Sequence, residues 1–309
     1  MNLERVRRAL AGISGVHLTP YDGSGAINAA LLGAIVADMA IAGVHNIVSA
    51  GNTGEFFALN SDEVMRVHEV VIAAVAGRAL VTAAVGRSLV EATATARAAK
   101  RAGADAIMAH HPLDPFAAPQ AQADYFIALA EASELPLVAY VRSDLISAGD
   151  LARVAMHPNV AGVKFATANL MLLAECLRAT EGHPAVWVCG LAEGWAAPFY
   201  ALGTRGFTSG LVNVDPKRSL AIWAALEAGD FAAARRLVDI IAPFEAMRTK
   251  FSNGANVTVV KEALMLLGIA VGPVRAPGLT ALDAADRERL RGVLTGWGLR
   301  PLPVSVAPQ

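Results

Sequence analysis

The chain has 309 residues, a formal net charge of −1 and a composition that is 55% hydrophobic but only 6% aromatic. This charge balance offers no basic surface for nucleic acid or an acidic membrane, and so apolar a chain is expected to fold around a large core. The longest apolar stretch, residues 70–86, is broken by Gly77 and Arg78, so it is predicted to be a helix end followed by a strand and not a membrane span.

The N-terminus and the cysteines favour a cytoplasmic protein. The first ten residues, MNLERVRRAL, mix acidic and basic side chains, and no apolar segment of a secretory signal follows them. Cys176 and Cys189 are too few for a disulfide framework or a structural zinc site, and both are expected to be buried thiols. Small-molecule chemistry, with no nucleic-acid or membrane partner, is therefore expected.

Short β-branched runs alternate with longer runs rich in Ala and Leu, a pattern typical of βαβ units and a parallel sheet. Eight strands are predicted, at residues 16–19, 46–50, 80–85, 106–109, 137–141, 160–164, 186–189 and 206–209. The helices between them include residues 29–42, 61–76 and 90–102, the last of which ends in a cation and a glycine, Arg101-Ala102-Gly103.

Eight strands, each followed by a helix, favour an α/β fold of the closed (β/α)8 type, the TIM barrel, over an open doubly wound sheet. No convincing dinucleotide-binding fingerprint occurs, because Gly12-Ile13-Ser14-Gly15 is too loose a match. From Pro216 the chain is predicted to be helical to its end, at residues 219–227, 231–250, 257–267 and 283–294. We predict a barrel core over residues 1–215, and the last barrel helix with a C-terminal helical domain over residues 216–309.

Reactive groups in such a barrel lie where the strands end and the following loops begin. The polar or glycine residues at these ends are Thr19, residues 51–55, Arg87, His110, His111, Tyr140, Arg142, Lys164, Gly190, Thr208, Ser209 and Gly210.

Lys164 is the one lysine at the end of an apolar strand, since it follows Val160-Ala161-Gly162-Val163. The other four, Lys100, Lys217, Lys250 and Lys261, are expected on solvated helix faces or loops. Burial disfavours the ammonium ion, so a neutral amine is expected near pH 7, as imine formation with a ketone requires. The alternative is a lysine that pairs with a buried carboxylate and takes part in no chemistry.

Tyr140 and the turn at residues 51–54 are the next candidates. Tyr140 ends the apolar strand at residues 137–141, where a phenol can relay protons or merely pack in the core. The backbone N–H groups of Gly51-Asn52-Thr53-Gly54 can bind a carboxylate, with the Thr53 hydroxyl as a further donor, although such turns are common without function. Glu55 is expected to hold this loop.

His110 and His111 do not predict a metal site, because adjacent residues of a strand point to opposite sides and no HxH or HExxH spacing follows. No GxSxG elbow, P-loop or paired-carboxylate constellation occurs either.

The sequence resembles the dihydrodipicolinate synthase and N-acetylneuraminate lyase family of class I aldolases over nearly its whole length. Three motifs carry the resemblance in order: Gly51-Asn52-Thr53-Gly54-Glu55 followed by Leu59, Tyr140 in its strand, and Gly162-Val163-Lys164. The resemblance implies a (β/α)8 barrel with a C-terminal helical domain, a homo-oligomer (dimer or tetramer) and no cofactor. It also implies that Lys164 forms the imine, Tyr140 relays protons and the turn binds the substrate carboxylate.

Departures from the synthase pattern concern the substrate. Asn52 stands where synthases carry a threonine, and His110-His111-Pro112-Leu113-Asp114 lacks the tyrosine of the synthase relay. Arg142 follows Tyr140 by two residues, closer than the arginine of the synthases. Residues 54–59 (GEFFAL), Tyr140 with Arg142, and residues 272–277 (GPVRAP) look instead like the 5-dehydro-4-deoxyglucarate dehydratase branch, although residues 164–167 and the His110-His111 loop match it poorly.

We therefore expect a Schiff-base-forming lyase that acts on a 2-oxo acid, of the pyruvate type or a 2-oxo-3-deoxy sugar acid, by dehydration or retro-aldol cleavage. The expected catalytic residues are Lys164 and Tyr140, and the expected substrate-binding residues are Asn52, Thr53, Gly54, Arg142, Gly190, Thr208 and Ser209, with Asn213 beside them in the distal pocket. The alternatives are a dihydrodipicolinate synthase that condenses pyruvate with aspartate semialdehyde, a metal- or phosphate-dependent barrel, and a non-catalytic barrel that binds a small molecule.

Overall fold

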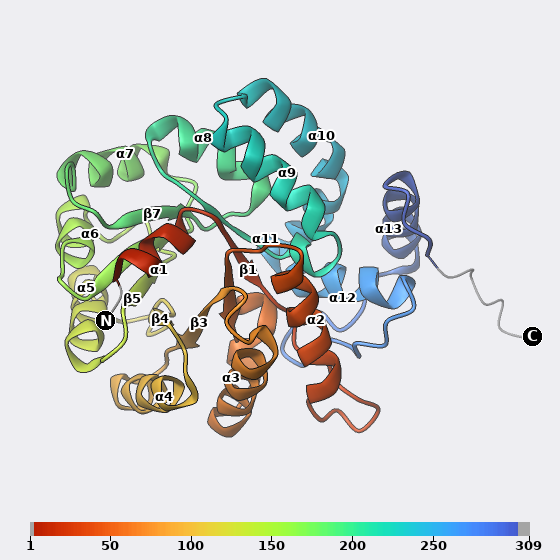
Figure 1. Ribbon diagram of the computed structural model, residues 1–309, viewed down its shortest axis with the longest axis horizontal. Helices are drawn as coiled ribbons and strands as arrows, with labels where there is room; N and C mark the ends of the chain where they lie inside the picture. The colour runs from red at the N-terminus through yellow and green to blue at the C-terminus, as the bar shows by residue number, and fades with distance from the viewer. Residues whose placement is uncertain (1–2, 302–309) are drawn as a thin grey trace, which may run out of the picture.

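The computed structural model describes residues 3–301, which form a closed barrel of parallel strands surrounded by helices (Figure 1). Each strand pairs with the next in the chain, and β8 closes the barrel on β1. The strands are β1 Ile13–Val16, β2 Asn46–Ser49, β3 Leu80–Val85, β4 Ala106–Ala109, β5 Leu137–Val141, β6 Val160–Phe165, β7 Val186–Cys189 and β8 Phe207–Ser209. The predicted (β/α)8 barrel is confirmed.

The helices outside the barrel begin and end at the signals that the sequence carries. They are α2 Ala29–Ile41, α3 Ser61–Val75, α4 Leu89–Ala102, α5 Pro119–Ala132, α6 Ala148–Ala155, α7 Leu170–Ala179, α8 Glu193–Leu202 and α9 Pro216–Glu227. Asn60 and Glu63 form a capping box at the start of α3, and Gly103 ends α4 with a left-handed φ of 100°. The predicted helices at residues 29–42, 61–76 and 90–102 are confirmed to within one residue.

The first strand lies earlier than the sequence predicted. β1 spans Ile13–Val16 and not residues 16–19, so the glycine motif that failed as a dinucleotide fingerprint is itself largely strand. Its small residues obscure the hydrophobic pattern on which strand prediction depends. Thr19 belongs to the loop after the strand, where its hydroxyl donates to the carbonyl of Gly54 at 2.7 Å.

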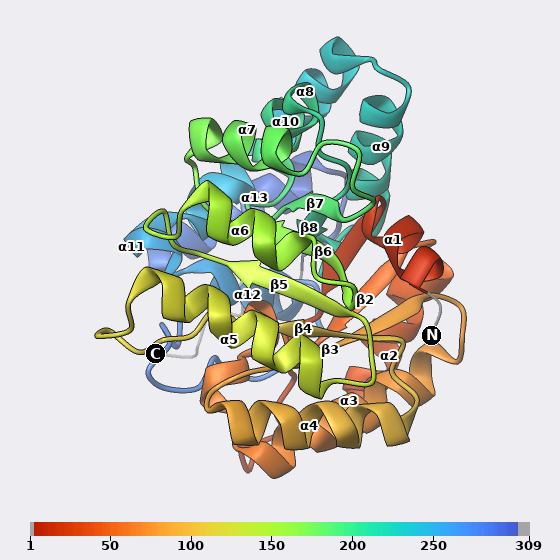
Figure 2. The same ribbon diagram turned by 90° about the vertical axis from the view of Figure 1, so that its left-hand side faces the viewer.

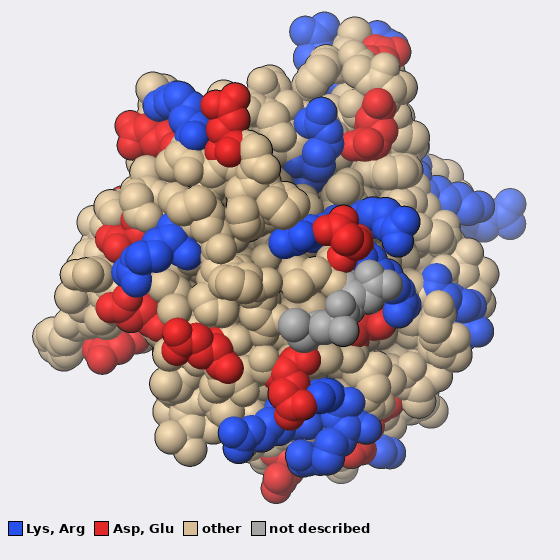
Figure 3. Space-filling view, turned by 60° about the vertical axis from the view of Figure 1, so that its left-hand side comes forward, with Lys and Arg blue, Asp and Glu red and all other residues tan. Residues whose placement is uncertain are grey.

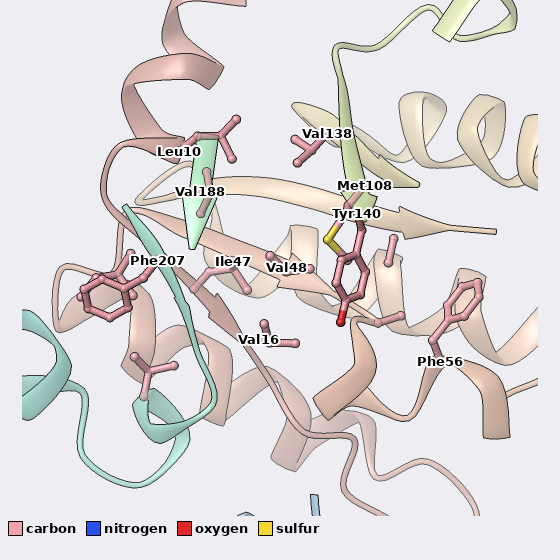
Figure 4. Packing of buried hydrophobic residues seen from close by; sticks show 14 of the residues in the cluster. Leu10, Val16, Ile47, Val48, Phe56, Met108, Val138, Tyr140, Val188 and Phe207 are labelled. Atoms are coloured by element: carbon pink, nitrogen blue, oxygen red, sulfur yellow. The ribbon is translucent and has the colours of Figure 1, made fainter. Parts of the chain in front are cut away.

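An N-terminal helix that the sequence analysis did not predict closes the amino end of the barrel. This helix, α1 Leu3–Leu10, buries Leu10, which lies with Val138 and Val188 at one end of the barrel interior, while Tyr140 and Phe56 lie at the other (Figure 4). Gly162 leaves room for it, since a Cβ there would lie 3.2 Å from Leu10 Cδ1 and would collide with the neighbouring strand.

The four helices predicted after β8 are confirmed, with bounds that differ by at most three residues, and a further short helix follows the second of them. Helices α10 Phe231–Arg248, α11 Lys250–Asn253 and α12 Asn256–Leu266 are separated from α13 Ala284–Gly296 by residues 267–283, a segment rich in glycine and proline. Figure 2 shows α10 packed beside α8 and α9. The division at residues 215/216 stays a prediction, because α12 also contacts the turns after β2 and β8.

The surface carries mixed charges. On the face shown in Figure 3, Lys and Arg side chains lie beside Asp and Glu side chains without forming one continuous patch. Within residues 3–301, no helix is long and apolar enough to cross a membrane. Cys176 and Cys189 are buried free thiols, as predicted.

Lys261 is buried, so its predicted position on a solvated face is wrong. Its side chain on α12 is 1% exposed, lies 2.6 Å from the Glu55 carboxylate and donates to the carbonyl of Pro273 at 3.0 Å. The second Glu55 oxygen accepts from the backbone N–H of Arg275 at 2.8 Å. Glu55 therefore holds its loop, as expected, by fixing it to the C-terminal region.

Replacing Lys261 with methionine is expected to lower the free energy of unfolding by about 3 to 5 kcal/mol, because Glu55 then stays buried without its counter-ion. Chemical denaturation measures the change. The matched control Lys100→Met removes an exposed ion pair with Glu134 and should leave the midpoint close to that of the wild type. Equal midpoints for the two variants contradict a stabilising role of the buried pair.

Candidate active site

A cavity of about 660 Å³ lies at the carboxyl ends of the strands and is walled on one side by the C-terminal helices. It brings together Asn52, Thr53, Tyr140, Arg142, Lys164, Gly190, Thr208 and Ser209 from the predicted site residues. The cavity lining does not include Gly54, whose carbonyl is bonded by Thr19, or Asn213. Six members of this set, from Tyr140 to Ser209, lie in or directly after the four consecutive strands β5 to β8. They meet because parallel strands present their carboxyl ends at one face.

Lys164 is buried at the base of this cavity. Its side chain on β6 is 5% exposed, and its amine lies 3.8 Å from the centre of the Tyr140 ring. Burial, reinforced by the nearby Arg142 charge, lowers its pKa to about 7. Among residues 3–301 no carboxylate forms an ion pair with it, so the alternative of a lysine neutralised by a buried carboxylate lacks the partner it requires.

Tyr140 stands directly beside Lys164, since the two are register partners on β5 and β6. Its ring is buried, and its hydroxyl oxygen accepts a hydrogen bond from the Asn52 side-chain amide at 2.9 Å. Burial raises the pKa of Tyr140, while Arg142 and the Asn52 hydrogen bond oppose this rise. The phenol therefore keeps its proton at neutral pH and can donate it.

The turn after β2 is a short 3₁₀ helix, Asn52–Gly54, with Thr53 buried beneath the cavity. The first N–H groups of such a turn have no acceptor within it. Glu55 follows in the left-handed region (φ 63°), a conformation that its ion pair with Lys261 supports. The turn is thus held by Thr19, which donates to Gly54, and by the Glu55 ion pair, and its residues Asn52 and Thr53 line the cavity.

The ends of β4 and β5 carry three further polar residues. His110 and His111 follow β4, and Arg142 follows β5. Arg142 is exposed at the cavity wall. His110 is buried, stacks on Phe56 with ring centres 4.2 Å apart, and has its pKa lowered to about 3 by burial and by the charge of Lys164. His111 packs toward Phe126 instead, so the two histidines have different surroundings, as predicted. Within residues 3–301 no cluster of His, Cys, Asp or Glu is placed to hold a metal ion.

The residues predicted for the distal pocket at the end of β8 have different surroundings. Thr208 lines the cavity, but the Ser209 hydroxyl is bonded to the buried Glu193, whose pKa burial raises to about 7. The Asn213 side chain accepts from Leu18 N–H at 2.9 Å and donates to two carbonyls, so it holds the loop after β8, and it is not part of the cavity lining.

Several cavity residues come from the C-terminal helices and were not predicted from the sequence, among them three with charged or amide side chains. Arg248 and Glu245 lie on α10, and Asn256 begins α12. They occur in helical segments with no local pattern of a binding site, so only the docking of these helices on the barrel reveals them.

The low pKa of Lys164 predicts a pH dependence of imine formation. The amine must be neutral to attack, so the rate with pyruvate should rise with pH through about 7 and then level off. Removing the cation in Arg142→Met should raise the pKa of Lys164 and move the rise to higher pH, whereas Arg142→Lys should keep it nearer its original position. Timed quenching with borohydride and intact mass measure the rate. A profile that rises only near 10 contradicts the buried, neutral amine.

The fold and the site together define a class of enzyme: barrels in which a buried lysine forms an imine with a carbonyl substrate. The profile of the Dihydrodipicolinate synthetase family matches residues 9–296, and the chain belongs to this family. It is accordingly a Schiff-base-forming lyase that acts on a 2-oxo acid of the pyruvate type.

Relatives with different activities are about equally similar to this chain. A 4-hydroxy-tetrahydrodipicolinate synthase of Methanoculleus marisnigri is 34% identical over 83% of this chain and 88% of its own length. A Streptomyces avermitilis protein named "Probable 5-dehydro-4-deoxyglucarate dehydratase 2" is also 34% identical, over 95% of this chain and 89% of its own. The crystal structure of dihydrodipicolinate synthase from Bacillus clausii superposes with a TM-score of 0.92 at 37% identity, covering 95% of this chain and 100% of that one.

Proposed function

We propose that Lys164 forms the imine with a 2-oxo-3-deoxy sugar acid and that Tyr140 moves the protons, with dehydration or retro-aldol cleavage as the outcome. One observation carries this proposal: the Lys164 amine, with a pKa of about 7, lies 3.8 Å from the Tyr140 ring in the cavity that also contains the Thr53 turn.

The substrate carboxylate docks on the N–H groups and hydroxyl of the Thr53 turn, which places C2 toward Lys164. The neutral amine attacks C2 and gives a carbinolamine. Tyr140 donates its proton to the departing hydroxyl, so that water leaves and a protonated imine forms. Because the Tyr140 oxygen already accepts from Asn52, its own O–H is free to point at the substrate. Asn52 thus supports the proposal as the partner of Tyr140 more directly than as a substrate ligand.

The protonated imine acts as an electron sink for either of two outcomes. In a dehydration, the Tyr140 phenolate left by the preceding step takes a C3 proton and gives an enamine, and Tyr140 then returns this proton to the C4 hydroxyl, which the enamine expels as water. Cleavage of the C3–C4 bond after deprotonation of the C4 hydroxyl gives an aldehyde and the enamine of pyruvate, which is protonated at C3. Hydrolysis of the imine then regenerates Lys164 in both cases.

Three residues support the sugar-acid substrate over synthase chemistry. Asn52 replaces the first threonine of the synthase relay and is occupied by Tyr140, and His110 stacks on Phe56 where the synthase pattern leads into its tyrosines. Arg142 is exposed at the cavity wall, where it can meet a distal hydroxyl or carboxylate. Gly190 and Thr208, also in the wall, complete the proposed substrate contacts.

Borohydride reduction in the presence of pyruvate tests the chemistry. One reduced pyruvate should be added to the intact mass, and peptide mapping should place it on Lys164. An unchanged mass supports the alternative hypothesis of a non-catalytic barrel that binds its ligand without covalent attachment. An adduct on Lys261 or another lysine also overturns the proposal.

A panel of 2-oxo-3-deoxy sugar acids and diacids, scored separately for pyruvate release and for water loss, tests the substrate. Turnover of one panel member is expected. If only pyruvate with aspartate semialdehyde gives turnover, the enzyme is a synthase and the sugar-acid assignment is wrong.

We also propose that the chain works as a homo-oligomer, a dimer or tetramer, in the cytoplasm. Apolar side chains on the loops after the neighbouring strands β4 and β5 support self-association, because Leu113, Phe116 and Leu145 are 61%, 94% and 75% exposed. Light scattering on the purified protein should give a dimer or tetramer mass, and a monomer mass contradicts the assembly.

A further inference from the structure

Arg248 brings a second guanidinium to the cavity, from the C-terminal helices and not from the barrel loops. It lies near the end of α10, is 6% exposed and forms part of the cavity wall. The cavity lining contains two guanidinium groups, on Arg142 and Arg248, but only one carboxylate, on Glu245. The wall therefore has an excess of positive charge, which a substrate with more than one carboxylate can neutralise.

The Arg248 guanidinium is held in a fixed orientation. Its Nε and Nη2 donate to the Asn256 side-chain oxygen at 2.9 and 2.6 Å, and its Nη1 donates to Glu245 at 2.6 Å. These bonds use three of the five N–H groups, so one remains on each terminal nitrogen. A guanidinium with its fork fixed in advance binds a carboxylate with little loss of side-chain entropy.

Gly210, directly after β8, is what allows Arg248 to approach. A Cβ at this position would come well inside 3.0 Å of Arg248 Nη2, a separation that real Cβ atoms essentially never show. The backbone itself does not require glycine, because φ of Gly210 is −95°. The same Cβ would lie 3.5 Å from the Thr53 hydroxyl, so Arg248 and Thr53 face a common region above the strand end.

We propose that Arg248 is a specificity-determining residue, given room by Gly210, that binds a second carboxylate of the substrate and so selects 2-oxo diacids over monoacids. This inference rests on the proposed function, in which the Thr53 turn binds the first carboxylate and Lys164 the 2-oxo carbon. Arg142 is exposed and attracts anions in general. Arg248 is buried and preorganised, so it distinguishes a substrate whose far end is a carboxylate from one whose far end is uncharged.

The test compares a 2-oxo-3-deoxy diacid with the monoacid of equal length that ends in a hydroxymethyl group. The wild type should prefer the diacid in kcat/KM. Arg248→Met should lower the diacid-to-monoacid ratio of kcat/KM by about 10- to 100-fold, mainly through KM of the diacid, because a charged hydrogen-bonding partner of its far end is lost. Arg248→Lys, which keeps the charge without the fork, should lower the ratio less.

Gly210→Ala provides an independent variant, since it removes no charge but displaces the guanidinium, and it should lower the same ratio. Its matched control is Gly292→Ala on α13, where an added Cβ meets nothing within 4 Å and the ratio should be that of the wild type. If Arg248→Met does not fold, the diacid-to-monoacid ratios of Gly210→Ala and Arg248→Lys still test whether Arg248 selects the diacid.

An unchanged ratio, equal losses for both substrates, or a wild-type preference for the monoacid overturns the inference. Equal losses identify Arg248 as a strut between α10 and α12 or as a ligand of the shared carboxylate. Borohydride trapping of pyruvate on wild-type Lys164 distinguishes failure of this inference from failure of the proposed function. If the adduct forms but the ratio is unchanged in the variants, only the role of Arg248 is refuted. If no adduct forms, the imine chemistry itself is refuted.

Discussion

Lys164→Met is expected to reduce turnover to background, a fall of about 10⁴-fold or more, and to remove the pyruvate adduct after borohydride reduction. The reason is that the amine provides the covalent bond through which electrons flow, and no neighbouring group replaces it. The matched control is Lys217→Met, an exposed lysine at the start of α9, which should keep both turnover and adduct. An adduct that persists in Lys164→Met contradicts the imine mechanism.

The same variant makes a prediction about stability. Because the pKa of Lys164 is about 7 in the folded protein, against an ordinary value of 10.5, the unfolded chain binds more protons between these pH values. This group therefore makes the wild-type free energy of unfolding rise with pH across that window, and Lys164→Met should lack this part of the slope. Denaturation curves at pH 7 and pH 10 measure the difference. Burial of the Lys164 amine is expected to destabilise the wild type at pH 7. If Lys164→Met is less stable than the wild type at this pH, that expectation is contradicted.

Tyr140→Phe is expected to lower kcat by about 10²- to 10⁴-fold, because the carbinolamine then loses water without its positioned proton donor. The imine with pyruvate should still form, but more slowly, since Lys164 keeps its low pKa and its place on β6. The variant leaves the ring in place against Lys164, so packing is preserved. Borohydride quenching at timed intervals measures imine formation, and steady-state kinetics on the same substrate measure turnover.

The control for this variant is Tyr125→Phe, which removes a phenol on α5 outside the cavity. Its kcat should match that of the wild type. Asn52→Ala should lower kcat by less than Tyr140→Phe, because it removes only the hydrogen bond that orients the phenol. If Tyr140→Phe retains wild-type kcat, the proton relay belongs to another group, and core packing is the role of the tyrosine.

Periodicity predicted most of the barrel because buried parallel strands are continuous apolar runs and the helices between them begin and end at caps. It failed at β1, whose small residues carry no apolar pattern. It also failed to predict α1, a short helix whose role is to place Leu10 against the barrel. In each case, packing against distant elements outweighs the local pattern.

Some residues of the site could likewise be predicted from the sequence and others could not. Lys164 and Tyr140 were recognisable in the sequence because a lysine and a tyrosine at the ends of apolar strands of a barrel must meet at one face. The roles of Asn52 and Arg248 were not recognisable, since each depends on a partner that local patterns do not reveal. Asn52 bonds a tyrosine 88 positions away, and Arg248 reaches the cavity only across Gly210.

The sequence by itself determined the fold class, the family resemblance and the two residues expected to carry the chemistry, because these follow from periodicity and from polar residues at strand ends. Only the tertiary structure decided the pKa of Lys164, the burial of Lys261 against Glu55 and the arrival of Arg248 beside Thr53. The physical reason is that desolvation and charge pairing depend on which remote segments enclose a group. Closure of the barrel and the docking of α10 and α12 set those surroundings, and the buried amine of Lys164 owes its proposed reactivity to them.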